Sequence, residues 1–121
     1  MTTPNLGLDE LTASQSQPHV PLNSALRRLD ALVFLTFRHM DMQAPPTAGS
    51  PDIAEGDAYW IPAAGSPAAS GAWEGYEGHV AYYAGGGWEF VQPLEGWLAW
   101  DMVASALKVY TAGAWATLAT V

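Results

Sequence analysis

Carboxylates and aromatic residues lie close together in the C-terminal half of the chain, a combination that suits chemistry on glycans. The acids are Glu74, Glu77, Glu89, Glu95 and Asp101, and their aromatic neighbours include Trp73, Tyr76, Trp88, Trp97 and Trp100. A glycosidase needs two carboxylates on opposite sides of one glycosidic bond. The positions of these acids along the chain do not place any two of them at that separation. The simpler interpretation is that they face solvent and supply solubility. A small glycan-degrading enzyme stays as an alternative.

The tryptophans also suit binding without catalysis. The chain has six Trp and five Tyr, and both side chains combine an apolar face with a polar edge, which suits sugar rings and protein interfaces. In the segment 97–103, Trp97 and Trp100 lie on opposite faces of an expected strand. The aromatics could simply fill the core, but two Trp on opposite faces favour a partner over one face. The surface expected to meet a glycan or a partner comprises Trp73, Tyr76, Trp97 and Trp100.

Other kinds of reactive site find little support in the sequence. His19, His39 and His79 are far apart and show no metal-ligand spacing. The chain has no Cys, and it has no Gly-x-Ser-x-Gly, Ser-x-x-Lys or phosphate-binding glycine motif. We therefore expect no catalytic residue, no cofactor and no metal, and a protein that is not an enzyme.

Length and charge limit the classes of protein to which the sequence can belong. A chain of 121 residues makes one small domain. Its net charge of −8 disfavours nucleic-acid binding, because an acidic protein releases no counterions from phosphates. No secretory signal or apolar run of membrane-spanning length is visible. We expect synthesis in the bacterial cytoplasm and no insertion into a membrane.

The N-terminal part, residues 1–43, is expected to hold an arm followed by one long helix. Apolar residues with helical spacing predict a helix over about 21–39, with a wide apolar stripe. The stripe consists of Leu22, Leu26, Leu29, Val33, Phe37 and Met40. Because a lone helix is marginal in water, the stripe must pack on the chain's own β domain or on other subunits. Residues 44–56 are rich in Pro and small residues, and they predict an extended connector.

The C-terminal part, residues 57–121, is expected to form a small antiparallel, aromatic-rich β domain, as a meander, barrel or sandwich. The fold class is thus α+β, mainly β. Segments rich in aromatic or β-branched residues, bounded by Gly or Pro, predict strands. They are 57–61, 79–84, 88–92, 97–103, 107–111 and 115–119. Tight hairpins are expected between Tyr83 and Trp88 and between Tyr110 and Trp115.

Several segments in order along the chain carry a family resemblance. They are 17–20 (QPHV), 23–32 (NSALRRLDAL), 55–61 (EGDAYWI), 71–75 (GAWEG), 87–93 (GWEFVQP) and 96–100 (GWLAW). The chain resembles an uncharacterised domain family found in tail-fibre and spike proteins of phages and of alphaproteobacterial gene transfer agents. The resemblance runs from about Leu6 to Trp115. It transfers no catalytic residue, because the family has none established.

The resemblance implies a virion protein that supports host attachment. Family members often continue into a longer fibre, whereas this sequence stops at Val121, which suggests a base or adaptor subunit of a head spike or tail fibre. The implied partners are further copies, as a trimer or pentamer, and other virion proteins such as capsid, portal, tail or fibre subunits. Host surface polysaccharide is a further partner to consider, and a carbohydrate-binding module is the main alternative function.

Overall fold

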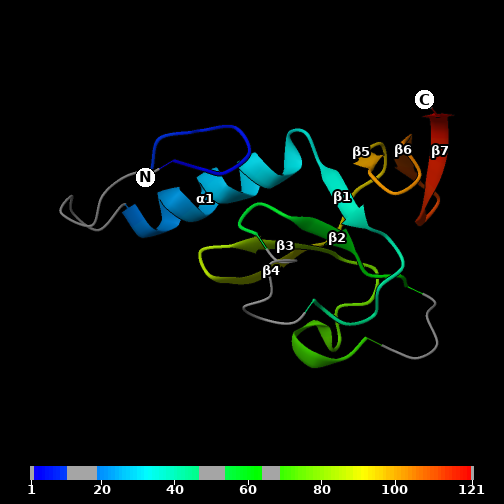
Figure 1. The fold of residues 1–121 in the computed structure, drawn as a ribbon, viewed down its shortest axis with the longest axis horizontal. Coiled ribbons are helices and arrows are strands. Elements are labelled where there is room, and N and C mark those ends of the chain that lie inside the picture. Colours follow the sequence, from blue (N-terminus) through cyan, green and yellow to red (C-terminus); the bar gives the residue numbers. More distant parts are fainter. Residues whose placement is uncertain (1, 11–18, 47–53, 64–68, 121) are drawn as a thin grey trace.

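The computed structural model describes residues 2–10, 19–46, 54–63 and 69–120 (Figure 1). Within these residues lie one α-helix, one short 3-10 helix and seven strands. In chain order these are α1 (His19–Leu32), β1 (Thr36–His39), β2 (Ala58–Trp60), η1 (Gly71–Trp73), β3 (Val80–Ala84), β4 (Gly87–Val91), β5 (Leu98–Asp101), β6 (Ala106–Thr111) and β7 (Ala114–Thr120). The mainly β, α+β class expected from the sequence is confirmed.

The strands form one mixed sheet in the order β4-β3-β2-β1-β5-β6-β7. β1 lies at its centre and pairs in parallel with both β2 and β5, whereas the other pairs are antiparallel. The expected all-antiparallel sheet is therefore wrong at its centre. Residues 57–121 do not form the sheet alone, because β1 comes from the N-terminal part.

The helix is shorter than the apolar spacing predicts. It ends at Leu32, and residues 36–39 are a strand instead of a fifth helical turn. Phe34 and Thr36 are exposed while Leu35 and Phe37 are buried, which is the two-residue alternation of a strand. Nearly all residues around this point are apolar, and such a run fits helical spacing as well as strand alternation. The sequence therefore does not show where the helix ends and the strand begins.

All six strands predicted in the C-terminal part are present, with no end shifted by more than two residues. The two expected hairpins are confirmed as two-residue turns, Gly85-Gly86 and Ala112-Gly113. All four turn residues have positive φ, which is the geometry that matches the twist of the flanking strands.

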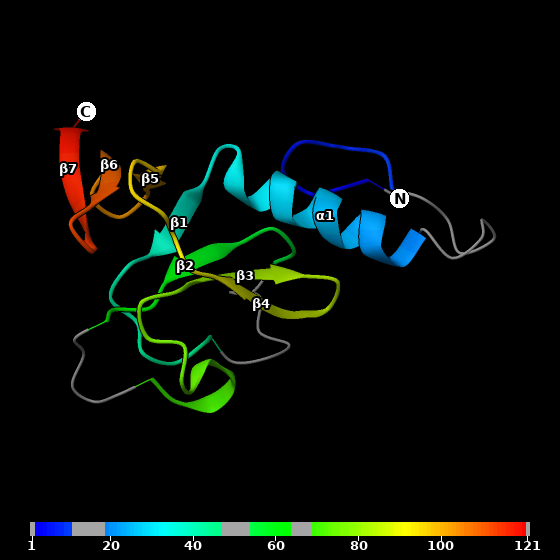
Figure 2. The same ribbon diagram turned by 180° about the vertical axis from the view of Figure 1, so that it is seen from behind.

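The β2–β4 half of the sheet is buried on both faces. Ala58, Trp60, Val80 and Tyr82 face a first core, which also holds Ala31, Leu35, Phe37 and Ala99. Tyr59 and Ala81 face a second core with Ile61, Ala69 and Trp73. In Figures 1 and 2, α1 runs along one side of this half-sheet and η1 lies on the other side.

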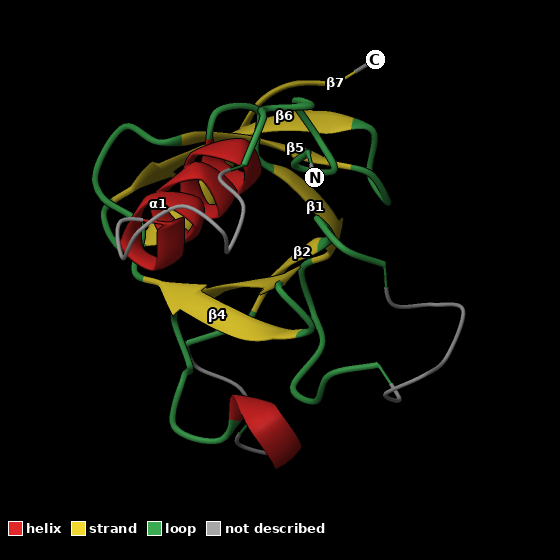
Figure 3. Cartoon of the chain, turned by 90° about the vertical axis from the view of Figure 1, so that its left-hand side faces the viewer, coloured by secondary structure: helices red, strands yellow, loops and turns green. Residues whose placement is uncertain are grey.

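The sheet is strongly curved around the first core. Trp115 of β7 packs edge-on against Trp60 of β2 and Phe37 of β1, with ring centroids 5.9 and 5.2 Å apart. Since β2 and β7 are four positions apart in the strand order, these contacts require the sheet to bend. Figure 3 shows β4 and the β5–β7 strands on opposite sides of α1.

Candidate binding surfaces

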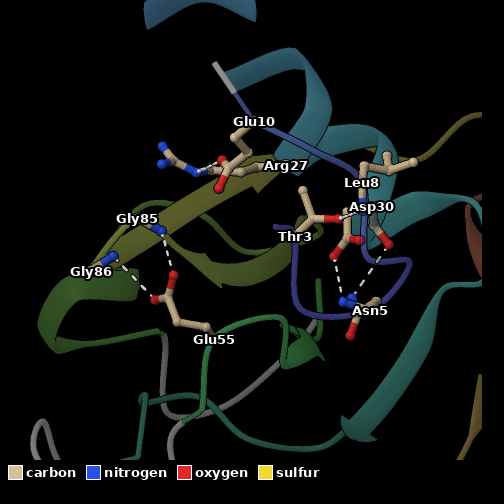
Figure 4. Close-up of polar contacts among 9 residues, drawn as sticks. All are labelled: Thr3, Asn5, Leu8, Glu10, Arg27, Asp30, Glu55, Gly85 and Gly86. Atoms are coloured by element: carbon tan, nitrogen blue, oxygen red, sulfur yellow. Dashed lines mark hydrogen bonds and ion pairs between the residues drawn. The ribbon is translucent and has the colours of Figure 1, made fainter. Parts of the chain in front are cut away.

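The N-terminal segment 2–10 is fixed to α1 by one buried carboxylate (Figure 4). Asp30 is 2% exposed, and it accepts the backbone N–H groups of Asn5 and Leu6 at 3.0 and 2.6 Å. The Asn5 side-chain amide donates to the carbonyls of Asp30 and Gly56 at 3.3 and 3.2 Å. A side chain at Gly56 would collide with Asn5 and Pro4. The segment is therefore held closely on the body of the domain.

A cleft of about 430 Å³ lies between this segment, α1 and the β3–β4 turn. Arg27 Nε forms an ion pair with Glu10 Oε2 at 2.9 Å. The Glu55 carboxylate accepts the N–H groups of Gly85 and Gly86 at 2.8 and 3.1 Å (Figure 4). Arg27 pairs with Glu10, and backbone N–H groups hold Glu55, so these contacts position the loops around the cleft.

Beyond the cleft, an apolar face lies on β5 and β6. The register pairs Leu98 with Val109 and Trp100 with Leu107, which places all four side chains on one face. The opposite face of these strands points into the first core through Ala99 and Tyr110. The outer face therefore points away from that core.

A groove of about 340 Å³ crosses this face next to the α1–β1 turn. Its lining combines Val33, Phe34, Leu35 and Thr36 with Leu98, Ala99, Trp100 and Leu107. None of these eight residues is charged. Phe34 is 77% exposed and Leu98 is 53% exposed, so the groove opens on surface that water solvates poorly. We call Val33, Phe34, Leu98, Trp100, Leu107 and Val109 the apolar patch.

The stripe predicted for subunit contact is split by the fold. Leu22 and Leu29 remain half-exposed on α1, and Val33 follows on the turn. Leu26 is partly buried. Phe37, by contrast, is fully buried on β1, so it offers no surface to another subunit. Met40 packs against the first core.

The four predicted aromatic surface residues do not form one platform. Trp73 is fully buried in the second core, which corrects its assignment as a surface residue. Tyr76 follows η1 and stacks on Phe90, with centroids 3.6 Å apart. Trp97 packs on the first core, and Trp100 lies on the apolar patch. In Figures 1 and 2, η1 and β5 lie on different sides of the molecule.

The candidate acids mostly hold turns. Glu77 accepts the Ala69 N–H at 2.9 Å, and buried Asp101 accepts the N–H groups of Val103 and Ala104. Glu95 accepts the Thr111 hydroxyl and the Ala112 N–H, and these bonds lower its pKa. These hydrogen bonds stabilise loops and occupy the carboxylates of these three residues.

Tyr82 and Arg28 also have shifted pKa values, and they contact each other. Burial raises the pKa of the Tyr82 hydroxyl, and the hydrogen bond from Arg28 Nε at 3.4 Å raises the pKa of Arg28. This bond ties α1 to β3. Glu89 also raises the pKa of both groups through its charge.

His39 and His79 each contact a different tyrosine. The His39 ring stacks on Tyr59 at 6.2 Å, and His79 contacts the Glu77 carbonyl and the edge of Tyr76. His19 begins α1. In the part of the chain that the structure describes, no three His, Asp or Glu side chains gather as metal ligands would.

Sequence reasoning identifies two members of the apolar patch, Val33 in the helix stripe and Trp100 in the expected partner surface, but not the patch as a whole. The helix predicted over 21–39 places Phe34 off the main stripe, and the predicted strands assign no surface to Leu98, Leu107 or Val109. One signal was available, because Leu98 and Trp100 alternate with Ala99 and Asp101. That alternation puts the larger apolar residues on one face and the small and charged residues on the other.

Comparison with known proteins gives one family match. A family model described as "Protein of unknown function (DUF2793)" matches residues 22–116. The match includes α1 from Leu22 onward, the sheet as far as Ala116, and the whole apolar patch. No curated protein matches the chain. Among the described residues, no helix has both the length and the apolar character needed to span a bilayer.

Proposed function

The chain belongs to the DUF2793 family of proteins of unknown function, and we propose that it is a structural, non-enzymatic subunit of a phage-like particle. In this proposal it is the base or adaptor of a head spike or tail fibre and supports host attachment. It assembles with its own copies, as a trimer or pentamer, and with capsid, portal, tail or fibre proteins. The particle context rests on the sequence resemblance described above.

The observation that supports an assembly role is the amount of apolar surface left uncovered. The apolar patch on β5 and β6 and the half-exposed Leu22 and Leu29 on α1 lie outside both cores. Exposed apolar side chains that are contiguous on a small domain are typical of interaction sites. Three of the five candidate acids, Glu77, Glu95 and Asp101, hold turns through hydrogen bonds, which favours a subunit over an enzyme.

Particles made without this gene test the proposal. Producer cells with the gene deleted are expected to release particles that lack one appendage in electron micrographs. Complementation with the wild-type gene restores the appendage, and the protein is found in purified particles by mass spectrometry. Intact appendages on the deletion particles, together with absence of the protein from wild-type particles, contradict the proposal.

One observation favours a second candidate, a glycan-binding module. Tyr76 is 38% exposed and stacks nearly parallel on Phe90, with 4° between the rings, so its outer face is a rigid platform for a sugar ring. Binding to host surface polysaccharide that is lost in Tyr76→Ala and kept in Leu94→Ala supports this candidate. Equal binding by both variants, or none by the wild type, counts against it.

A further inference from the structure

The last strand of the sheet, β7, is an unprotected edge. Among the described residues it pairs only with β6, and in Figures 1 and 2 it lies at the end of the sheet, away from α1. Its sequence, AWATLAT, has no charged residue, Gly or Pro, and all of it except Trp115 is exposed. The opposite edge strand, β4, carries Glu89 and is followed by Pro93. Charges and prolines protect edges from further pairing, so β7 is the edge that can accept another strand.

The hydrogen-bond pattern shows which backbone groups of β7 face outward. Tyr110 N–H donates to the Trp97 carbonyl, and Gly96 N–H donates to the Tyr110 carbonyl, both at 2.8 Å. The backbone of Tyr110 is therefore bonded on the β5 side, and Trp115, which lies opposite it on β7, directs its own N–H and C=O groups toward the free edge. Thr117 does the same, two residues further along. A strand that pairs with these groups extends the sheet.

One face of β7 has room for large side chains from such a strand. Ala114 and Ala116 lie opposite Thr111 and Val109 of β6, so they share a face with the apolar patch residue Val109. Adjacent strands lie about 4.8 Å apart, which places a side chain of an added strand beside Ala116. The small methyl group leaves space for a large apolar side chain to extend toward Val109.

The other face of β7 supplies one positive charge. Lys108 Nζ donates to Thr117 Oγ1 at 2.8 Å, which holds the ammonium beside the outer strand. No other Lys or Arg follows Arg38 in the sequence. A carboxylate on the added strand, opposite Thr117, would pair with this ammonium, whereas a Lys or Arg there would be repelled.

We propose that β7 accepts an extended segment of another protein as an additional antiparallel strand. The segment has large apolar residues on one face and a single carboxylate residue at the centre of the other. A second copy of this chain does not offer that pattern at its β4 edge, because Trp88 and Phe90 already pack against the second core. The net charge of −8 on each copy also opposes self-association. The inference rests on the proposed function in one respect, since it gives the chemistry by which another particle protein would attach.

Peptide titration of the isotope-labelled full chain tests the strand pairing by NMR. The probe is a capped peptide of alternating Thr and Leu with Glu at its centre (TLTLELTLT). Up to about 1 mM peptide is expected to shift the Trp115 and Thr117 amide signals and to slow their hydrogen exchange. N-methylation of the Glu and of the Thr two positions to either side removes the N–H groups that face β7, and should weaken binding at least ~10-fold.

A peptide N-methylated on the Leu residues is the matched control, because those N–H groups point away from β7 in an antiparallel pair. It is expected to bind like the unmodified peptide. Equal binding by the two methylated peptides, no binding by the unmodified one, or signal shifts confined to another surface each overturn the proposed pairing.

A charge exchange tests the side-chain preference. The wild type is expected to bind the Glu peptide about 3-fold more tightly than the same peptide with Lys at its centre. Lys108→Glu is expected to reverse this order, with circular dichroism confirming an unchanged fold. If the order of the two peptides is the same in both proteins, the assignment of an acidic partner residue is wrong.

Thr117→Pro separates this inference from the proposed function. The change removes an N–H that faces outward and leaves the bonds to β6 in place, and Pro is tolerated at such positions of edge strands. The variant is expected to unfold at the wild-type temperature, to lose peptide binding, and to give particles without the appendage. Appendages that persist in this variant but are missing after gene deletion overturn only the β7 contact.

The converse result is equally informative. Peptide binding that Thr117→Pro abolishes, together with intact appendages on deletion particles and no protein in wild-type particles, supports the β7 contact and overturns the proposed function. A wild type that self-associates, with the association lost in Thr117→Pro, assigns the edge to a second copy and overturns the partner proposed here.

Discussion

Asp30 joins segments that are distant in the sequence, because its buried carboxylate accepts the N–H groups of Asn5 and Leu6. We expect Asp30→Asn to lower the free energy of unfolding by about 2 kcal/mol, since an amide replaces a charged acceptor and turns one donor toward another. Urea unfolding measures this loss, and faster hydrogen exchange at Asn5 and Leu6 locates it. Asp9→Asn, at an exposed site, is the control. Equal stability of the two variants would contradict the role given to Asp30.

Glu95 provides a pH-dependent contribution at the turn between β6 and β7. The Thr111 hydroxyl and the Ala112 N–H lower its pKa below 4.5, so the ionised form is favoured in the folded state. The stabilising contribution is present above pH 4.5 and is lost as pH falls through the lowered pKa. We expect Thr111→Val to raise the pKa of Glu95 toward 4.5 in an NMR titration. Thr117→Val should leave this pKa unchanged, and no difference between the variants would refute the assignment.

Trp73 shows that residue types alone do not decide whether an aromatic side chain is buried or exposed. Its sequence neighbours are small or polar, and this pattern fits an exposed aromatic residue as well as a buried one. It is buried because η1 places it against Tyr59 and Trp88, with ring centroids 5.6 and 5.3 Å away. These contacts link residues from three separate segments, so no local pattern could predict them.

The β3–β4 hairpin depends on two glycines with different surroundings. Both have positive φ, so Gly85→Ala and Gly86→Ala should each cost about 1–2 kcal/mol. A methyl group at Gly85 would lie 3.0 Å from Arg27 Nη1, whereas nothing lies within 4 Å at Gly86. We therefore expect the larger loss for Gly85→Ala in thermal or urea unfolding.

An Arg27→Ala background isolates the steric part of this difference. Without the guanidinium, the two alanine substitutions should cost the same, because only the backbone strain remains. If Gly85→Ala stays the more damaging change in that background, contact with Arg27 is not its cause.

At the level of elements, strands were predictable and the end of the helix was not. The six C-terminal strands are rich in aromatic or β-branched residues and have Gly or Pro near at least one end, so local rules locate them. Residues 33–37, in contrast, are almost all apolar, and helical and strand patterns both fit them. Residues 36–39 form a strand because β1 pairs with β2 and β5. This pairing depends on the whole fold.

At the scale of the whole molecule, the central strand of the sheet, β1, comes from the N-terminal part. We expect a fragment of residues 44–121 to be largely unfolded, since it lacks β1 and leaves the space of Phe37 beside Trp115 empty. Far-UV circular dichroism and amide dispersion in NMR spectra measure this, with the full chain as control. A fragment that melts cooperatively would show that residues 57–121 form an independent domain after all.

The position of β1 also determines when the protein can finish folding during its synthesis. β1 leaves the ribosome early, but its neighbour β5 follows only after more than half of the chain length. Until then one edge of the nascent strand has no hydrogen-bonding partner, and Phe37 stays uncovered. Sheet closure is therefore a late, non-local event, and we expect the growing polypeptide to expose apolar surface until β5 has been made.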